Sequence, residues 1–128
     1  MLTLATSRLL AYALCPFFLL VDFFRRFGSW IAEWPMILDD VIAGVLLLVA
    51  IARLRSARSD GRLWLVAAWA YGVGMMYGSF FGQLFEPDAP DPSGLPSRFV
   101  IGVKAALFAA CIAGLAGAIR GDRASATR

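Results

Sequence analysis

Residues 36–54, MILDDVIAGVLLLVAIARL, decide the fold class. Apart from Asp39, Asp40 and Arg53, every residue in this stretch is apolar or glycine. A helix needs about 20 such residues to cross the ~30 Å hydrocarbon layer of a bilayer, whereas a membrane-spanning strand alternates apolar and polar residues over about ten positions. The stretch does not alternate, so it predicts a membrane-spanning helix.

Three further apolar runs occupy most of the remaining chain, at about residues 4–24, 63–85 and 98–119. The chain has 128 residues and 60% of them are hydrophobic, which is more apolar surface than a soluble domain of this length can cover. No A-x-A-like cleavage site follows the first run, so we expect a retained helix there. The sequence predicts an all-α integral membrane protein, a four-transmembrane-helix bundle forming a single transmembrane domain over residues 1–128.

The positive charges divide unequally between the two sides of such a bundle. One side, which includes both termini and the connection between the second and third runs, carries Arg8, Arg53, Arg55, Arg58, Arg62, Arg120, Arg123 and Arg128. The other side carries Arg25, Arg26 and Arg98. Cytoplasmic loops of membrane proteins are enriched in Lys and Arg, so we expect both termini to be cytoplasmic and the membrane to be a bacterial inner (plasma) membrane. This distribution accounts for the net charge of +3 without a nucleic-acid partner.

Few residues suit a metal or cofactor. The chain has no histidine, and its two cysteines, Cys15 and Cys111, form no C-x-x-C pair, so no metal site of the Cys/His type is predicted. Residues 86–97, EPDAPDPSGLPS, contain three acids and four prolines and predict a stiff polar loop. Three carboxylates could hold a divalent cation, but they lack regular ligand spacing. We interpret the segment as a solvated linker and predict no cofactor.

Small residues recur at every fourth position in the third and fourth runs. They are Gly74, Gly78 and Gly82 in the third run, and Gly102, Ala106, Ala110, Gly114 and Ala118 in the fourth. Such residues let helix backbones approach closely in lipid, where packing replaces the hydrophobic drive. We expect antiparallel packing of the third and fourth helices through these faces. Alternatively, one of the faces packs against a second copy of the chain.

The two adjacent aspartates lie on the smaller side of the second helix. At 100° per residue, Asp39 and Asp40 flank a stripe that continues through Ala43, Leu47 and Ala50. Bulkier residues lie on the opposite side and suit contact with lipid. We therefore expect the two carboxylates to face another helix or a water-filled cleft.

Polar residues of the other helices fall near the same depth. With Asp39 and Asp40, the sequence predicts a candidate ion- or proton-binding cluster that includes Asp22, Tyr77 and Lys104, because ionisable residues inside a membrane mark functional sites. Ser79 and Gln83 lie near them in the third run.

Structural explanations remain open for the same residues. Asp22 precedes Arg25 and Arg26 by three and four positions, a spacing that favours a local ion pair. Lys104 could extend to the lipid headgroups. The two aspartates of the second helix could pair with Lys104 or Arg98, or with hydroxyls and waters.

Three classes of function are compatible with these features. The first is an oligomeric transporter or channel for a cation, a proton or a small solute, using the polar cluster. The second is a non-catalytic accessory or assembly subunit of a larger membrane complex, recognised through the small-residue faces. The third, an enzyme acting on lipid headgroups, lacks the further carboxylates and histidines that such sites need, so no catalytic residue is predicted. The expected partners are the lipid bilayer and either further copies of the chain or other membrane subunits.

Overall fold

The computed structural model describes residues 2–121, and this part of the chain is folded into four α-helices. They are α1 (Leu4–Arg25), α2 (Trp34–Arg55), α3 (Gly61–Phe85) and α4 (Ser97–Arg120). All four are long and apolar enough to cross a membrane. The predicted all-helical architecture is therefore confirmed.

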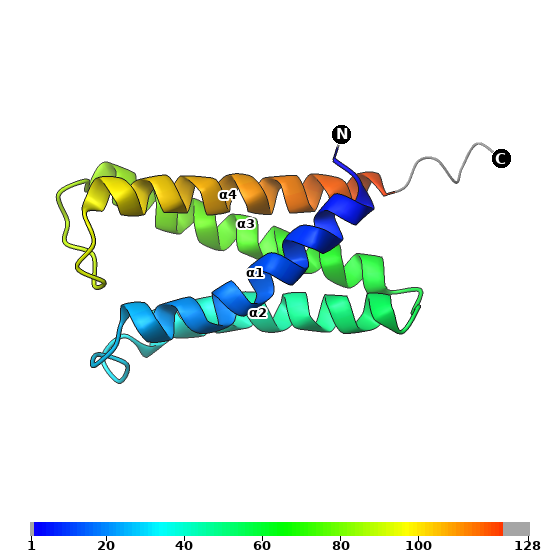
Figure 1. Ribbon diagram of the computed structural model, residues 1–128, viewed down its shortest axis with the longest axis horizontal. Helices are drawn as coiled ribbons and strands as arrows, with labels where there is room; N and C mark the ends of the chain where they lie inside the picture. Colours follow the sequence, from blue (N-terminus) through cyan, green and yellow to red (C-terminus); the bar gives the residue numbers. More distant parts are fainter. Residues whose placement is uncertain (1, 122–128) are drawn as a thin grey trace.

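The helices form a ring in which each contacts the next along the chain and α4 contacts α1. In Figure 1, α1 and α3 run diagonally and cross in projection between α2 and α4. At the end that carries connections 26–33 and 86–96, α1 lies beside α2 and α3 beside α4, and these two pairs diverge. We call this the open end. The opposite end, with connection 56–60, the start of α1 and the last turn of α4, is the closed end.

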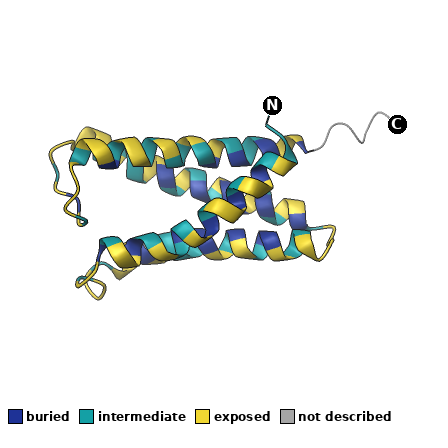
Figure 2. Ribbon diagram, viewed as in Figure 1, coloured by how far each residue is buried: buried dark blue, intermediate teal, exposed yellow. Residues whose placement is uncertain are grey.

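The second helix turns its smaller side inward, as predicted. Ala43, Leu47 and Ala50 are buried, whereas Val45 and Leu48 on the bulkier side are exposed. Figure 2 shows the buried positions along the inward sides of the helices. The periodicity of this segment therefore indicated the correct inward face.

Three helices meet at a buried contact in the closed half of the bundle. The Ser7 hydroxyl of α1 donates a hydrogen bond to the Gly114 carbonyl of α4 at 2.7 Å. The Trp69 indole of α3 donates to the same hydroxyl at 2.8 Å. A Cβ on Gly114 would lie 2.4 Å from the Trp69 ring, so a glycine is required for this approach. We call Ser7, Trp69 and Gly114 the three-helix contact.

The end of α4 is held at the same end of the molecule by Arg62. Its guanidinium donates a hydrogen bond to the Ala118 carbonyl at 2.8 Å and a second to the Ile119 carbonyl. The last carbonyls of a helix have no partner within the helix and carry its partial negative charge. Arg62 therefore caps α4 from the start of α3.

The expected small-residue contact between α3 and α4 differs from the observed packing. A Cβ placed on Gly74, Gly78, Gly82 or Gly102 would have no heavy atom of a neighbouring element within 4 Å in the described chain. The stripe on α4 is divided: Gly114 and Ala118 are buried, whereas Gly102 and Ala106 are exposed and Ala110 is half-buried.

Aromatic side chains explain this difference. Near the open end, Phe80 of α3 stacks on Phe108 of α4 with a centroid separation of 6.0 Å, and Phe81 meets the same ring edge-on at 6.2 Å. Contact between the two helices near the open end is therefore made by these bulky rings. Close glycine-mediated packing of α3 on α4 occurs instead at Gly114 and, with Cys111, at Gly72.

Candidate functional site

A cavity of about 990 Å³ lies between the diverging helix pairs at the open end. This volume is within the range typical of small-molecule sites. Residues of all four helices and of the 86–96 connection line it. The charged lining residues are Asp22, Arg25, Arg26, Glu33, Asp39, Asp40, Asp91 and Lys104. The apolar lining residues include Phe17, Phe18, Met36, Met75, Met76, Phe99, Val103 and Leu107.

Asp22 is the centre of an ion-pair network at the end of α1. Its carboxylate accepts hydrogen bonds from Arg25 at 3.0 Å and from Arg26 at 3.2 Å, and the residue is only 4% exposed. The ion pair predicted from the i+3 and i+4 spacing is thus present. Arg26 also binds Glu33 of the first connection. Burial alone would lower the pKa of Arg26, but Glu33 and Asp22 together raise it, so Arg26 is a permanent cation here.

The 86–96 connection joins this network through Asp91. Arg25 donates to the Asp91 carboxylate at 2.5 Å, although the two residues are far apart in sequence. The backbone N–H of Ser93 donates to the same carboxylate at 2.9 Å, as does the Ser93 hydroxyl. The Asp91 side chain is only 1% exposed. The interpretation of this segment as a solvated linker is therefore wrong at Asp91, because the loop folds back toward the end of α1 (Figure 1).

Protonation of Asp91 is expected to weaken the fold in acid. Burial alone would raise the pKa of Asp91, but hydrogen bonds from Ser93 and Arg25 hold it below its ordinary value of 3.8. A carboxyl whose pKa is depressed on folding stabilises the fold above its unfolded-state pKa, and this contribution is lost as the pH falls through the folded-state pKa. We expect Asp91→Asn to lower the free energy of unfolding by about 2 kcal/mol near neutral pH. The difference from wild type should disappear well below pH 3.8.

The measurement is unfolding in mixed detergent micelles as a function of pH. Asp88→Asn is the matched control, because Asp88 is an exposed aspartate of the same connection and does not line the cavity. A constant Asp91→Asn deficit down to the lowest pH would contradict the assigned role of the carboxylate charge.

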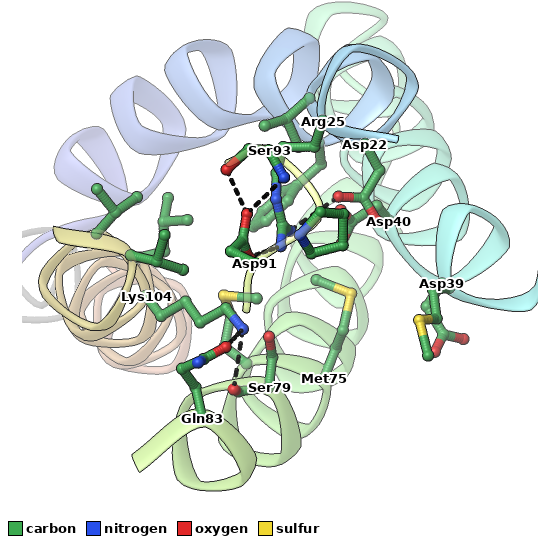
Figure 3. Close-up of a pocket in the computed structure, with 18 of the residues that line it drawn as sticks. Asp22, Arg25, Asp39, Asp40, Met75, Ser79, Gln83, Asp91, Ser93 and Lys104 are labelled. Carbon is green, nitrogen blue, oxygen red and sulfur yellow. Dashed lines mark hydrogen bonds and ion pairs between the residues drawn. The ribbon is translucent and has the colours of Figure 1, made fainter. Parts of the chain in front are cut away.

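Lys104 of α4 contacts neutral acceptors of α3. Its ammonium donates to the Gln83 side-chain oxygen at 3.3 Å and to the Ser79 carbonyl at 3.4 Å, as Figure 3 shows. Within residues 2–121 it forms no ion pair. The suggested pairing of Lys104 with Asp39 or Asp40 is thus not formed.

The two adjacent aspartates of α2 differ in their surroundings. Asp39 is exposed and accepts a hydrogen bond from the Tyr71 hydroxyl of α3 at 3.3 Å. Asp40 is half-buried and lies beside Asp22 in the cavity (Figure 3). Both line the cavity, in agreement with the expectation that they face a cleft.

Tyr77 lies apart from the other candidate residues. It does not line the cavity, and its side chain is exposed on the aromatic face of α3, 4.7 Å from the Phe81 ring centroid. Four of the five predicted residues therefore line one cavity: Asp22, Asp39, Asp40 and Lys104. Of these, Asp39 is the exposed one, and Tyr77 lies outside the lining.

Sequence reasoning missed four charged members of the site. Arg25 and Arg26 were assigned to the connections, Asp91 belonged to a segment interpreted as a solvated linker, and Glu33 was given no role, yet all four line the cavity. For Asp91, the sequence offers one local signal: an Asp two residues before a Ser can accept that residue's backbone N–H and form a turn. That signal predicts a turn but not the contact with Arg25.

No family model, no curated protein and no solved structure matches this chain.

Proposed function

We propose that the chain is an integral membrane protein with cytoplasmic termini that transports a small solute or cation through its cavity. The observation that carries this proposal is the cavity itself, which all four helices line at a single end and to which α1, α2 and α4 contribute charged side chains. Intramembrane ionisable residues that face a cavity mark solute and ion pathways. Because the arginine-rich connection is at the closed end, the positive-inside rule makes the open end the external side.

The closed half of the bundle favours a transporter over a pore through one chain. Leu47, Leu65 and Trp69 are at most 1% exposed and lie outside the cavity lining, so they fill the interior between the cavity and the closed end. A solute that enters from the open end meets this packed layer. Passage then requires a rearrangement of the helices, which is the alternating-access mode in which a central site faces one side at a time.

An accessory or assembly subunit is the second candidate. The observation that favours it is the stripe of Gly102 and Ala106 on α4, which is exposed along the half of the helix nearest the open end. Small residues of this kind allow close helix–helix approach in lipid. Another membrane subunit, or a further copy of a transporter protomer, would pack there.

Flux through reconstituted vesicles tests the transport proposal. Proteoliposomes are assayed for proton, Na⁺ and K⁺ flux, with and without a mixture of amino acids, polyamines and carboxylates on one side. We expect flux in wild type and in Asp88→Asn, whose side chain lies outside the cavity. Asp40→Asn removes a charge from the cavity. For this variant we expect the rate of flux to fall at least about tenfold, which is equivalent to the loss of one charge-assisted interaction.

The variants must first give the wild-type elution volume and melting temperature in detergent. Two results together would contradict transport and support the accessory role. Wild-type protein would show no flux, and it would co-purify from its native membrane with other subunits in fixed ratio.

A further inference from the structure

The charges that line the cavity divide into a paired set and an unpaired set. The paired set holds two guanidinium groups and three carboxylates: Arg25, Arg26, Asp22, Glu33 and Asp91. Every guanidinium in it already has two carboxylate partners. No positive charge is therefore left over in this set to neutralise a further carboxylate.

The unpaired set consists of Asp40 and Lys104, which are both half-buried. Among residues 2–121, the Asp40 carboxylate has no ion pair and accepts no hydrogen bond from a donor group. The Lys104 ammonium has only neutral acceptors. Asp39, also outside the ion pairs, is exposed and bound by Tyr71, so it differs from Asp40.

These two opposite charges enter the same cavity from different helices. Asp40 projects from α2 and Lys104 from α4. In the view of Figure 3, Arg25 and Asp91 lie between them, and Met75 of α3 also borders this space. They do not approach within ion-pair distance of one another. Each is partly removed from water, and a partly buried charge without a partner is unfavourable.

We infer that the ligand of this cavity is a zwitterion, with a cationic group bound at Asp40 and an anionic group bound at Lys104. One molecule that carries both charges supplies the missing partner to each side chain through charge-assisted hydrogen bonds. The part of the ligand between its charges would lie against Met36, Met75 and Leu107, and methionine side chains adapt to ligands of varied shape. This inference rests on the proposed function in one respect: it takes the cavity to be the site where the solute binds.

Two sources share this chemistry: a free amino-acid-type solute and the headgroup of a zwitterionic phospholipid.

The free solute is tested by measuring binding to wild-type protein in nanodiscs of phosphatidylglycerol, a lipid that has no cationic group. The probes are ω-amino acids from γ-aminobutyrate to ω-aminododecanoate, each compared with the alkylamine and the alkanoate of the same carbon number. At the best chain length, we expect the zwitterion to bind at least about tenfold more tightly than either singly charged analogue.

Two variants assign the ends of the ligand. Lys104→Gln should abolish the preference for the zwitterion over the alkylamine, and Asp40→Asn should abolish its preference over the alkanoate. Arg98→Gln and Asp88→Asn are the controls, because both side chains are exposed and outside the cavity lining. They should keep both preferences.

The lipid source is tested by native mass spectrometry after exchange into equal amounts of phosphatidylethanolamine and phosphatidylglycerol. Retention of phosphatidylethanolamine that is lost in Lys104→Gln and Asp40→Asn supports the headgroup as the ligand. If the alkylamine binds wild type as tightly as any ω-amino acid, and neither lipid is preferred, the inference is overturned. Flux that depends on Asp40 would still stand in that case, so failure of the inference is distinguishable from failure of the transport proposal.

Discussion

Replacing Gly114 by alanine is expected to lower the free energy of unfolding by about 3 kcal/mol, because overpacking a close helix contact forces backbone or ring displacement. The added Cβ would lie 2.4 Å from the Trp69 ring, which is buried and cannot turn outward. Displacing Trp69 also disturbs the hydrogen bond that its indole donates to Ser7. Two stabilising features of the three-helix contact are thus lost together. The measurement is reversible unfolding in dodecyl maltoside with increasing SDS.

Gly102→Ala is the matched control on the same helix. A Cβ at Gly102 would meet no neighbouring element within 4 Å in the described chain, and alanine favours a helix over glycine by about 1 kcal/mol. We therefore expect Gly102→Ala to be neutral or slightly stabilising. Equal destabilisation by the two substitutions would mean that the close approach of α3 to α4 at Gly114 is not formed.

Removal of the Asp22 carboxylate is the second change expected to have a large effect. Asp22→Ala leaves Arg26 with Glu33 as its remaining carboxylate partner and Arg25 with Asp91. The Arg26 side chain is only 9% exposed, so the lost partner cannot be replaced by bulk water. Breaking a buried ion pair by removing one member costs about 3–5 kcal/mol, and we expect the lower value because each arginine keeps a second partner.

The same unfolding measurement applies, with Asp88→Ala as the control. Asp88 is exposed, so its removal should change the free energy of unfolding by less than about 0.5 kcal/mol. A second test is the double variant Asp22→Ala/Asp91→Ala, which should be less stable than either single variant. Unchanged stability of Asp22→Ala would show that the network at the end of α1 contributes nothing to the fold.

The helices were predictable because their signal is local. Each is a long apolar run, and prolines mark two of the starts: Pro35 lies in the first turn of α2, and Pro96 precedes α4. The inward side of α2 was predictable for a similar reason, since side-chain size varies with helical period around Asp40 and Ala43. These properties depend on residues within one or two turns of each other.

The site was only partly predictable because it depends on how the helices diverge. The depth of Asp22, Asp40 and Lys104 along their helices can be estimated from sequence, and all three line the cavity. The contact between Arg25 and Asp91 depends instead on the path of a proline-rich loop. Glycines that recur along a helix show which face could approach another helix closely, but not whether it does so. Gly78, for example, lines the cavity instead of contacting α4 closely.

The three-helix contact also sets the order in which the protein can be completed during synthesis. Ser7 belongs to α1 and Gly114 to α4, so the ring cannot close until the chain as far as α4 has left the ribosome. At about 5–20 residues per second, the intervening segment takes several seconds to synthesise. During that time α1 has no α4 partner, and the Ser7 hydroxyl and the Trp69 indole lack the carbonyl that completes their chain of hydrogen bonds. The bundle therefore stays open on the side that α4 covers until the fourth helix has been made.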